Sequence, residues 1–247
     1  MKTNEREEQI ISLLREQSFI SVQELAARLY VSPSSIRRDL TRLEALGVVR
    51  RNYGGVVAAG GNPTSPPIAM RSEVNKAAKR AIAKKASVLL RDNLSVLLDD
   101  STTAAAMVEF LAPFKGISLF TNNLETASAA TERGICTYLL GGALPPDSAT
   151  VTVGSFALDM LRAIHVDICF FSTSALSESG DLFDSTEPHN LLRREMLRHA
   201  DTRVLLCDSS KFLRTSIYRS AHVDDINYIC TDKPLPPQIA VKKAKIL

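Results

Sequence analysis

The sequence predicts an α/β protein of two domains, a small helical one at the N-terminus and a larger one built around a mostly parallel sheet. Three observations support this. Residues 3–58 have helical apolar periodicity and end in two short apolar runs. Residues 59–67, AGGNPTSPP, are rich in glycine and proline and have no apolar period, which indicates a linker. In residues 68–247, apolar runs alternate with helical stretches, as in a sheet covered on both faces.

Two helices are predicted before residue 30. Asn4 and Glu7 have the spacing of a helix cap, and the helix that they open has four inward apolar positions, Ile10, Ile11, Leu13 and Leu14. Ser21 and Glu24 form a capping box that predicts a second helix over residues 22–29. A brief turn at residues 30–31 follows.

A third helix is predicted after Ser32, a good N-terminal cap, with Pro33 at the first helical position. Its apolar stripe recurs at i, i+4 and i+7, in Ile36, Leu40 and Leu43. The opposite face presents Ser34, Arg38 and Thr41, flanked by Ser35, Arg37 and Arg42. Arginine pairs bidentately with guanine, and hydroxyls reach phosphates or base edges, so this face suits the major groove of DNA. On this stretch alone, a solvated basic face is an equally good interpretation.

The flanking residues favour DNA. A helix, a short turn and a basic second helix make the helix-turn-helix arrangement. Gly47 predicts a left-handed helix end, and residues 48–51 and 56–57 predict a two-stranded wing around a glycine turn at 52–55. Residues 32–57 carry five arginines against Asp39 and Glu44, a local excess of +3 that favours nucleic acid. The candidate DNA-binding residues are Ser21, Ser32, Ser34, Ser35, Arg37, Arg38, Thr41, Arg42, Arg50 and Arg51.

The larger domain alternates helices with apolar strands. Helices are expected at residues 76–90, 103–111, 124–133, 156–163 and 191–200. Strands are expected at residues 94–98, 117–120, 135–140, 166–171, 204–207 and 228–230. Small polar residues follow nearly every strand, and in a parallel sheet these all lie at the carboxyl edge, where open α/β sheets bind ligands.

This edge predicts a pocket for a small anion. Residues 101–103 lie where a strand turns into a helix, and free backbone N–H groups there favour an anion. Gly141 and Gly142 allow a ligand to approach the backbone closely, and Lys211 adds a positive charge. We therefore favour a site for a phosphorylated small molecule over the alternative that these residues are only ordinary polar loop residues. The candidate ligand-binding residues are Asp99, Ser101, Thr102, Thr103, Thr121, Asn122, Gly141, Gly142, Asp208 and Lys211.

Composition excludes several classes of protein. The net charge is only +3, so the chain is no bulk polycation. Cys136, Cys169, Cys207 and Cys230 each lie in or at the end of an apolar run and are expected to be small buried residues, with neither disulfides nor a metal site. The histidines show no ligand spacing, and no cofactor is expected. No signal sequence or membrane span is apparent, which predicts a cytoplasmic protein.

The chain resembles the DeoR-type bacterial transcriptional regulators. The N-terminal signature is carried by Arg6, Ile10, Leu14, Ser32, Ile36, Arg37, Arg38, Asp39, Leu40 and the Tyr53-Gly54-Gly55 turn. Further along, the matching residues are Lys79, Ile82, Ala83, Asp99, Thr102, Thr103, Thr121, Asn122, Gly141, Gly142 and the 208–212 segment. The resemblance implies a sensor domain similar in fold to ribose-5-phosphate isomerase, which binds a sugar phosphate and controls DNA affinity. Ser35 stands where the family usually has threonine, a change expected to alter local packing and to leave DNA binding intact. Asp100 stands at a position that is usually small and neutral and Ser101 at one that is usually glycine, so the effector can differ from the commonest family ligands or lack a phosphate.

Two hypotheses remain open. The first is a repressor of a carbohydrate-utilisation operon that binds double-stranded operator DNA, senses a sugar phosphate and forms a homo-oligomer built from dimers through residues 68–247. The second is a sugar-phosphate isomerase with an accessory DNA-binding domain, in which Asp99, Asp208, Glu187 and Lys211 supply acid, base and electrostatic groups. The regulator ranks first, because a helix-turn-helix has no purpose in a simple isomerase.

Overall fold

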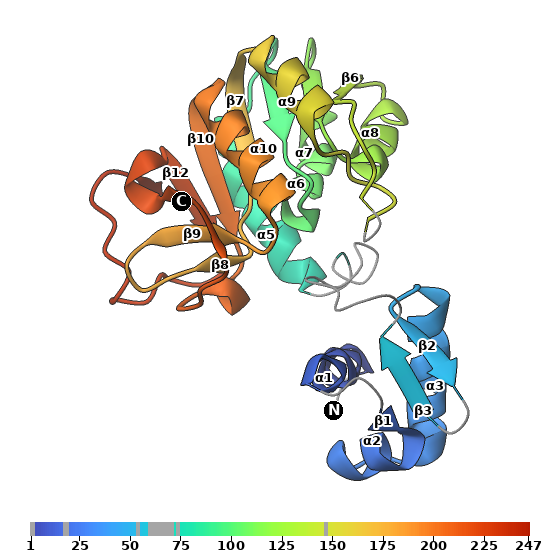
Figure 1. Cartoon of the computed structure of the whole chain (residues 1–247). Helices are drawn as coiled ribbons and strands as arrows, with labels where there is room; N and C mark the ends of the chain where they lie inside the picture. The colour runs from blue at the N-terminus through green and yellow to red at the C-terminus, as the bar shows by residue number, and fades with distance from the viewer. Residues whose placement is uncertain (1–2, 17–19, 53–54, 59–71, 73–74, 146–147) are drawn as a thin grey trace. The chain divides into compact units, whose positions relative to one another are not determined.

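The protein divides into two compact units, residues 1–74 and residues 75–247. The structure, a computed structural model, describes residues 3–16, 20–52, 55–58, 72, 75–145 and 148–247 (Figure 1). The predicted linker at 59–67 and the turn residues Tyr53 and Gly54 lie outside these ranges. Within them, no helix combines the length and the apolar character needed to cross a membrane.

Unit 1 is a three-helix winged unit. Its helices are α1 (Thr3–Glu16), α2 (Val22–Arg28) and α3 (Pro33–Ala45). Strands β2 (Val49–Asn52) and β3 (Gly55–Ala58) form the antiparallel wing, and β1 (Ile20–Ser21) pairs with β3 as an unpredicted third strand, in the order β1-β3-β2. The core is made by fully buried apolar side chains from all three helices, among them Ile10, Leu25, Ile36, Leu40 and Leu43.

Local sequence signals fix the ends of α2 and α3. Ser21 accepts a hydrogen bond from the Glu24 backbone N–H at 3.1 Å, and Ser32 accepts one from the Ser35 N–H at 3.2 Å. Gly47 has φ +69°, and its N–H and that of Val48 return to the Glu44 and Leu43 carbonyls, which is a Schellman ending. Two details of the predicted caps differ. Asn4 lies inside α1, and the Glu24 carboxylate accepts from Arg28, one helical turn on.

Unit 2 is built on a seven-stranded sheet in the order β13-β12-β10-β7-β4-β5-β6, and every described pairing in it is parallel. The strands are β4 (Ser95–Leu98), β5 (Ser118–Thr121), β6 (Cys136–Leu139), β7 (Val166–Phe171), β10 (Ala200–Cys207), β12 (Tyr228–Thr231) and β13 (Lys245–Ile246). The chain winds outward in one direction from β4 to β6 and in the other from β7 to β13. The strand order therefore reverses between β4 and β7, which is where such sheets bind ligands.

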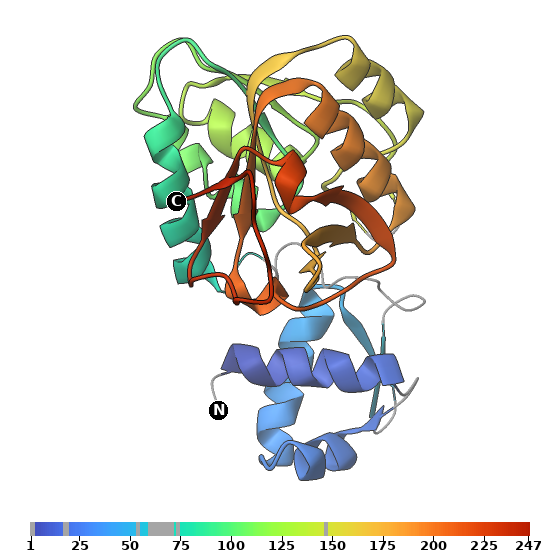
Figure 2. The ribbon, with the colours of Figure 1, turned by 90° about the vertical axis from the view of Figure 1, so that its left-hand side faces the viewer.

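Helices cover the two faces of this sheet. On the first face, α5 (Lys76–Ala86) packs on β10 and β12, α6 (Thr102–Ala105) on β7 and β10, and α8 (Leu124–Thr131) on β5 and β6. On the second face, α9 (Ser155–Arg162) packs on α10 (Glu187–Arg198), which packs on β7 and β10. Figure 2 shows α5 (teal) on one side of the strands, with α9 and α10 (gold and orange) on the other. A hydrophobic core lies on the first face, around Ile82, Leu98, Met107, Phe170 and Leu206.

Several predicted elements differ from the structure. The helix expected at 103–111 is divided into α6 and α7 (Val108–Leu111), and the one expected at 76–90 ends as α5 at Ala86, with a 3-10 turn (Ser87–Leu89) after it. Helix α10 begins at Glu187, four residues before its predicted start, and Ala200 already belongs to β10. An antiparallel sheet, β11-β9-β8, was not predicted; its strands are β8 (Ala175–Leu176), β9 (Asp181–Asp184) and β11 (Tyr218–His222).

Candidate functional site

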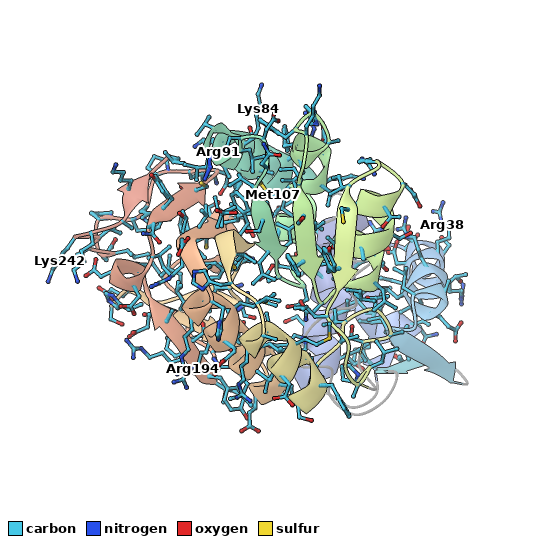
Figure 3. The ribbon with its side chains drawn as sticks, turned by 90° about the horizontal axis from the view of Figure 1, so that it is seen from above. Arg38, Lys84, Arg91, Met107, Arg194 and Lys242 are labelled. Carbon is cyan, nitrogen blue, oxygen red and sulfur yellow. The ribbon has the colours of Figure 1, made fainter. Side chains whose placement is uncertain are left out.

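The face of α3 opposite the buried stripe is exposed and carries unpaired cationic side chains. Ser34, Arg37, Arg38 and Thr41 are exposed, while Ile36, Leu40 and Leu43 on the opposite side are at most 1% exposed. Neither Arg37 nor Arg38 has an ion-pair or hydrogen-bond partner for its guanidinium among the described residues. Figure 3 shows the Arg38 side chain extending outward from α3. These guanidinium groups are therefore available to an external anion or base edge.

Two ion pairs fix α3 against α1. The Asp39 carboxylate is 2% exposed and accepts from the Arg6 Nε at 2.5 Å and from its Nη2 at 2.9 Å. The Arg42 Nε donates to the Glu7 carboxylate at 2.7 Å. Burial raises the pKa of Glu7, and Arg42 offsets this only in part, whereas the hydrogen bond to Asp39 raises the pKa of Arg6. Of the predicted DNA contacts, Arg42 is thus engaged inside the protein, with half of its side chain still exposed.

The hydroxyls at the start of α3 bind one another. The Ser32 Oγ lies 2.8 Å from the Ser34 Oγ and 3.0 Å from the Ser35 Oγ, in addition to its capping bond. The Thr41 hydroxyl donates to the Arg37 carbonyl at 2.8 Å. Ser21 caps α2. Arg50 and Arg51 lie on β2, opposite Val57 and Val56 of β3, and their side chains are outside the described part of the chain.

A hydrogen-bonded network joins the carboxyl ends of β4, β7 and β10. The Asp99 carboxylate, fully buried, accepts from the Ser101 N–H at 3.0 Å, the Ser101 hydroxyl at 2.5 Å and the Ser172 N–H at 2.9 Å. The Lys211 Nζ donates to the Ser172 Oγ at 2.7 Å and lies 3.5 Å from the Asp208 carboxylate. Asp99, Ser101, Asp208 and Lys211, which the sequence predicted to share a site, are therefore linked through Ser172, at the point where the strand order reverses.

Arg193 is the centre of this network, and sequence reasoning did not single it out. It is 5% exposed and comes from α10. Its guanidinium donates to Asp99 and to both oxygens of Asp184, at 3.1 and 2.9 Å, and lies 3.9 Å from Asp100. Burial disfavours the charged guanidinium, but the three carboxylates hold the pKa of Arg193 well above its usual value. Burial raises the pKa of Asp184 despite Arg193.

Thr102 and Thr103 lie on α6, and the other predicted residues, Thr121, Asn122, Gly141 and Gly142, form a second, adjacent group at the ends of β5 and β6. The Asn123 side-chain amide donates to the Asp100 carbonyl at 3.3 Å, which connects this group to the first. The Thr121 hydroxyl accepts from the Asn123 N–H, and the Asn122 amide donates to the Thr152 carbonyl at 3.0 Å. Gly142 has φ +153°, and a Cβ there meets the Val153 carbonyl oxygen at 2.5 Å, so the glycine is needed for packing against the chain itself.

Two buried polar atoms in these groups have no hydrogen-bond partner within the described residues: the Thr103 Oγ1 and the Asn122 Oδ1. Unsatisfied buried polar atoms are rare in folded proteins and call for an explanation such as a bound ligand or solvent. Ser101 caps α6 by accepting from the Ala104 N–H at 3.0 Å. Because α6 has only four residues, few peptide dipoles are aligned behind this cap, and the helix-dipole attraction expected for an anion is small.

The electrostatic balance at Asp208 favours its charged form. Burial alone raises the pKa of this carboxyl, but the charge of Lys211 and the hydrogen bond from Ser210 outweigh it, and the pKa lies below its usual value. Lys79, which is 7% exposed, also contributes its charge to Asp208. The edge therefore combines a cation at Lys211 with the Asp100 carboxylate, a combination suited to a polyhydroxylated anion, while the fully buried Asp99 carboxylate is already engaged by Ser101, Ser172 and Arg193.

The structure also bears on the predicted burial of the cysteines and on the residues of the isomerase hypothesis. Cys169, Cys207 and Cys230 are buried, but Cys136 is exposed, so its expected burial is wrong: it lies on β6, an edge strand of the sheet. Among the four residues of the isomerase hypothesis, Glu187 is exposed in the first turn of α10, while Asp99 and Asp208 are engaged with Arg193 and Lys211.

Comparison with known proteins gives matches along nearly the whole chain. The model of the DeoR-like helix-turn-helix domain matches residues 6–60, and that of the DeoR C terminal sensor domain matches residues 74–233. The chain is 30% identical to the L-fucose operon activator of Haemophilus influenzae, over 96% of this chain and 94% of that protein. It is 32% identical to the putative aga operon transcriptional repressor of Escherichia coli O157:H7, over 95% of this chain and 88% of that protein. These relatives are named as regulators and not as enzymes.

Among solved structures, ribose 5-phosphate isomerase A from Methanocaldococcus jannaschii is similar at a TM-score of 0.41 and 19% identity, over 56% of this chain and 55% of that chain.

Proposed function

The chain belongs to the DeoR family of transcriptional regulators, and from that membership we propose that it is a sequence-specific repressor whose affinity for operator DNA is set by a small phosphorylated sugar. The observation that supports DNA recognition most directly is the exposed, unpaired pair Arg37 and Arg38, on a helix whose other face is fully buried. A helix held by its core and by two ion pairs to α1 presents these side chains in a fixed orientation.

The DNA contacts divide by chemistry. Arg38, with Ser34 and Thr41, faces away from the apolar stripe and reads base edges in the major groove. Ser32, Ser35 and Arg37 lie at the sides of this face and contact phosphates, as do Ser21 at the start of α2 and Arg50 and Arg51 of the wing. Arg42 contributes mainly by holding α3 on α1 through Glu7.

The effector binds at the carboxyl edge of the large sheet, between the ends of β4, β7 and β10. Lys211 supplies the positive charge for a phosphate or other acidic group, and Asp100 accepts from sugar hydroxyls. Asp99 acts from beneath, by holding Ser101, Ser172 and Arg193 in place. The unsatisfied Thr103 hydroxyl and Asn122 carbonyl oxygen are further contacts that a ligand can complete. The buried carboxylates beside Lys211 favour a ligand with several hydroxyls over a bare phosphate.

The target is a carbohydrate-utilisation operon, as the names of the fucose and aga operon regulators suggest. One of these relatives is named an activator and the other a repressor, and repression is our choice for this chain. It is tested with a reporter fused to the promoter next to the gene: loss of the protein raises expression in the absence of the sugar if it represses, and lowers it if it activates.

The active form is a homo-oligomer built from dimers, located in the cytoplasm with the chromosome. A single recognition helix reads only a few base pairs, so two-fold pairing is needed for a site of useful length. Assembly through unit 2 leaves the winged units free to reach DNA.

An operator-binding titration tests the proposal. The purified full chain is titrated onto the promoter DNA in the presence and absence of a panel of pentose and hexose phosphates, and of the same sugars without phosphate. Specific binding that one sugar phosphate weakens at least tenfold, and its unphosphorylated sugar does not, supports the proposal. Conversion of any sugar phosphate into its isomer by the purified chain would instead favour the isomerase hypothesis.

A further inference from the structure

The second face of the large sheet is covered at its centre and open toward β6. Strand register aligns Tyr138 of β6, Phe120 of β5, Leu97 of β4 and Cys169 of β7 in one row across this face. Leu97 and Cys169 are completely buried, Phe120 is half-buried, and Tyr138 is 49% exposed. The rings of Phe120 and Tyr138 stack at 4.7 Å. A parallel sheet is normally covered on both faces, whereas the described part of the chain leaves Tyr138 at this end of the row half exposed.

Apolar side chains of α9 and of the loop after β6 extend the open area. Phe156 is 76% exposed and Met160, one turn further along α9, is 41% exposed. The Met160 sulfur accepts from the Gly141 N–H at 3.1 Å, which places this side of α9 against the end of β6. Leu144, in the loop after β6, is 51% exposed. We call Tyr138, Leu144, Phe156 and Met160 the β6–α9 surface.

The sequence around this surface is unusually poor in charge. Residues 134–160 contain two charged residues, Asp147 and Asp159, in a chain that is 23% charged. Exposed edge strands are normally protected by lysine, proline or other charged residues, and β6, CTYL, has none. The core of a protein–protein interface is typically enriched in aromatic residues and methionine and depleted of charged residues, as this surface is.

We propose that the β6–α9 surface is covered by the same surface of a second copy of this chain, related by a two-fold axis. In such an interface a surface meets itself, so it must complement itself. A surface without charged side chains can pack against its own copy without electrostatic repulsion. The pocket lined by Arg194, Arg198 and Arg203 on α10 and β10 would instead bring like charges together.

The area available is in the range that a dimer needs. From their exposed fractions, the four side chains offer roughly 400 Å² of apolar surface. A standard interface buries about 800 Å² per partner, and the unpaired edge of β6 and the described residues on either side of Leu144 supply the difference. This inference rests on the proposed function, because it names the surface through which the DNA-binding form assembles.

Light scattering of the full chain is the first test. The wild type is expected at a multiple of 27.0 kDa. Phe156→Glu and, separately, Leu144→Glu place a charge against its own copy and are expected to weaken pairing at least tenfold. Val88→Glu, at a position 71% exposed on the 3-10 turn after α5, is the matched control and keeps the wild-type mass. Circular dichroism checks that each variant is folded. Phe156→Leu, which keeps an apolar side chain at this position, should pair like the wild type.

Alkylation of Cys136 is the second test. Cys136 lies on β6 and is the exposed cysteine, whereas the other three are buried, with the pKa of Cys207 and Cys230 raised by burial to about 12. In the paired wild type, Cys136 should react at least tenfold more slowly than in Phe156→Glu at the same concentration.

Three outcomes overturn the inference: a wild type that is monomeric, a Phe156→Glu variant that keeps the wild-type mass, or a Cys136 that reacts equally fast in both. A monomer with a protected Cys136 would indicate that unit 1 of the same chain covers the surface. The proposed function fails separately, since specific DNA binding that survives loss of Arg38 contradicts the recognition helix and leaves this surface untouched.

Discussion

Two arginines one turn apart on α3 have different surroundings. Arg38 is exposed without a described partner, whereas the Arg42 guanidinium is held by the Glu7 carboxylate and lies 3.5 Å from Asp39. A charged group already satisfied inside the protein has less to gain from DNA than one that is free. The sequence pattern placed both on the exposed side of the helix but could not show this difference, because Glu7 lies 35 residues away.

Arg38→Ala should weaken specific DNA binding more than non-specific binding. A lost bidentate contact to a base costs roughly 1–3 kcal/mol, equivalent to about 5- to 150-fold in affinity for the operator. The measurement is a fluorescence anisotropy titration with operator and with scrambled DNA at one salt concentration. Arg91→Ala, which removes the same charge from an exposed position in unit 2, is the control. An unchanged ratio of specific to non-specific affinity would exclude Arg38 from base recognition.

Arg193 should be essential to the stability of unit 2, and this requirement should depend on pH. Its removal in Arg193→Met leaves Asp99, Asp100 and Asp184 buried without their counter-charge, which costs about 3–5 kcal/mol. The pKa of Asp184 is already raised by burial, and losing Arg193 raises it further. A carboxyl whose pKa is higher in the folded state takes up its proton on folding, so its unfavourable contribution disappears as the pH falls through that pKa.

The difference in unfolding free energy between wild type and Arg193→Met should therefore be largest at pH 7–8 and smaller near pH 5. Urea unfolding across this range measures it. Arg198→Met, an exposed arginine one turn and a residue further along the same helix, is the control. A difference that stays constant with pH would mean that the carboxylates are not the source of the destabilisation.

At the scale of elements, α1 acts as a support for α3. The Arg6–Asp39 and Glu7–Arg42 pairs bridge the two helices, so the residues of the N-terminal signature serve structure as much as DNA contact. We expect Glu7→Ala and Arg42→Ala each to loosen α1, with a coupling between the two of about 1 kcal/mol, modest because half of Arg42 is exposed.

That coupling is measured by hydrogen exchange of the α1 amides in the full chain. We expect a roughly fivefold loss of protection in either single variant and little further loss in the double variant. Arg28→Ala, which breaks the exposed pair with Glu24 within α2, should leave α1 unchanged. Strictly additive losses in the double variant would show that Glu7 and Arg42 act independently.

The elements that the sequence predicted well are those whose signals are local. Ser32 and Pro33 define the start of α3, Gly47 its end, and β7 has the predicted bounds. The missed elements depend on distant partners. Strand β9 pairs along its length with β11, more than 30 residues later, and has only the two-residue β8 as a nearby partner, while the short β1 pairs with β3. Arg193 was missed for the same reason: between Leu192 and Met196 it reads as an ordinary helical position, and its three carboxylates come from other elements.

At the scale of the whole molecule, the carboxyl-edge rule was the sequence argument for which residues lie near one another at the candidate site. It depends only on strands being parallel and on where the order reverses, and it brought Asp99, Ser101, Asp208 and Lys211 into one network. The rule did not predict that Gly142 packs against Val153 of the same chain. Proximity at a sheet edge follows from topology, whereas the use of each side chain follows from contacts that topology leaves undetermined.

Ligand control of DNA binding requires that the ligand bind the two states of the oligomer with different affinities. The glycine- and proline-rich residues 59–67 give no rigid connection by composition, so we expect the signal to pass through the arrangement of subunits, which sets the spacing of two recognition helices. Lys211→Ala, and separately Thr102→Ala combined with Thr103→Ala, should therefore abolish the response to the sugar phosphate. DNA affinity without ligand should stay within about twofold of wild type, because unit 1 is unchanged.

Lys84→Ala, an exposed lysine of α5, is the control in the operator titration. Variants that respond normally would place the effector away from this edge, and variants that also lose DNA affinity without ligand would mean that the edge network holds the oligomer together and does not sense the sugar.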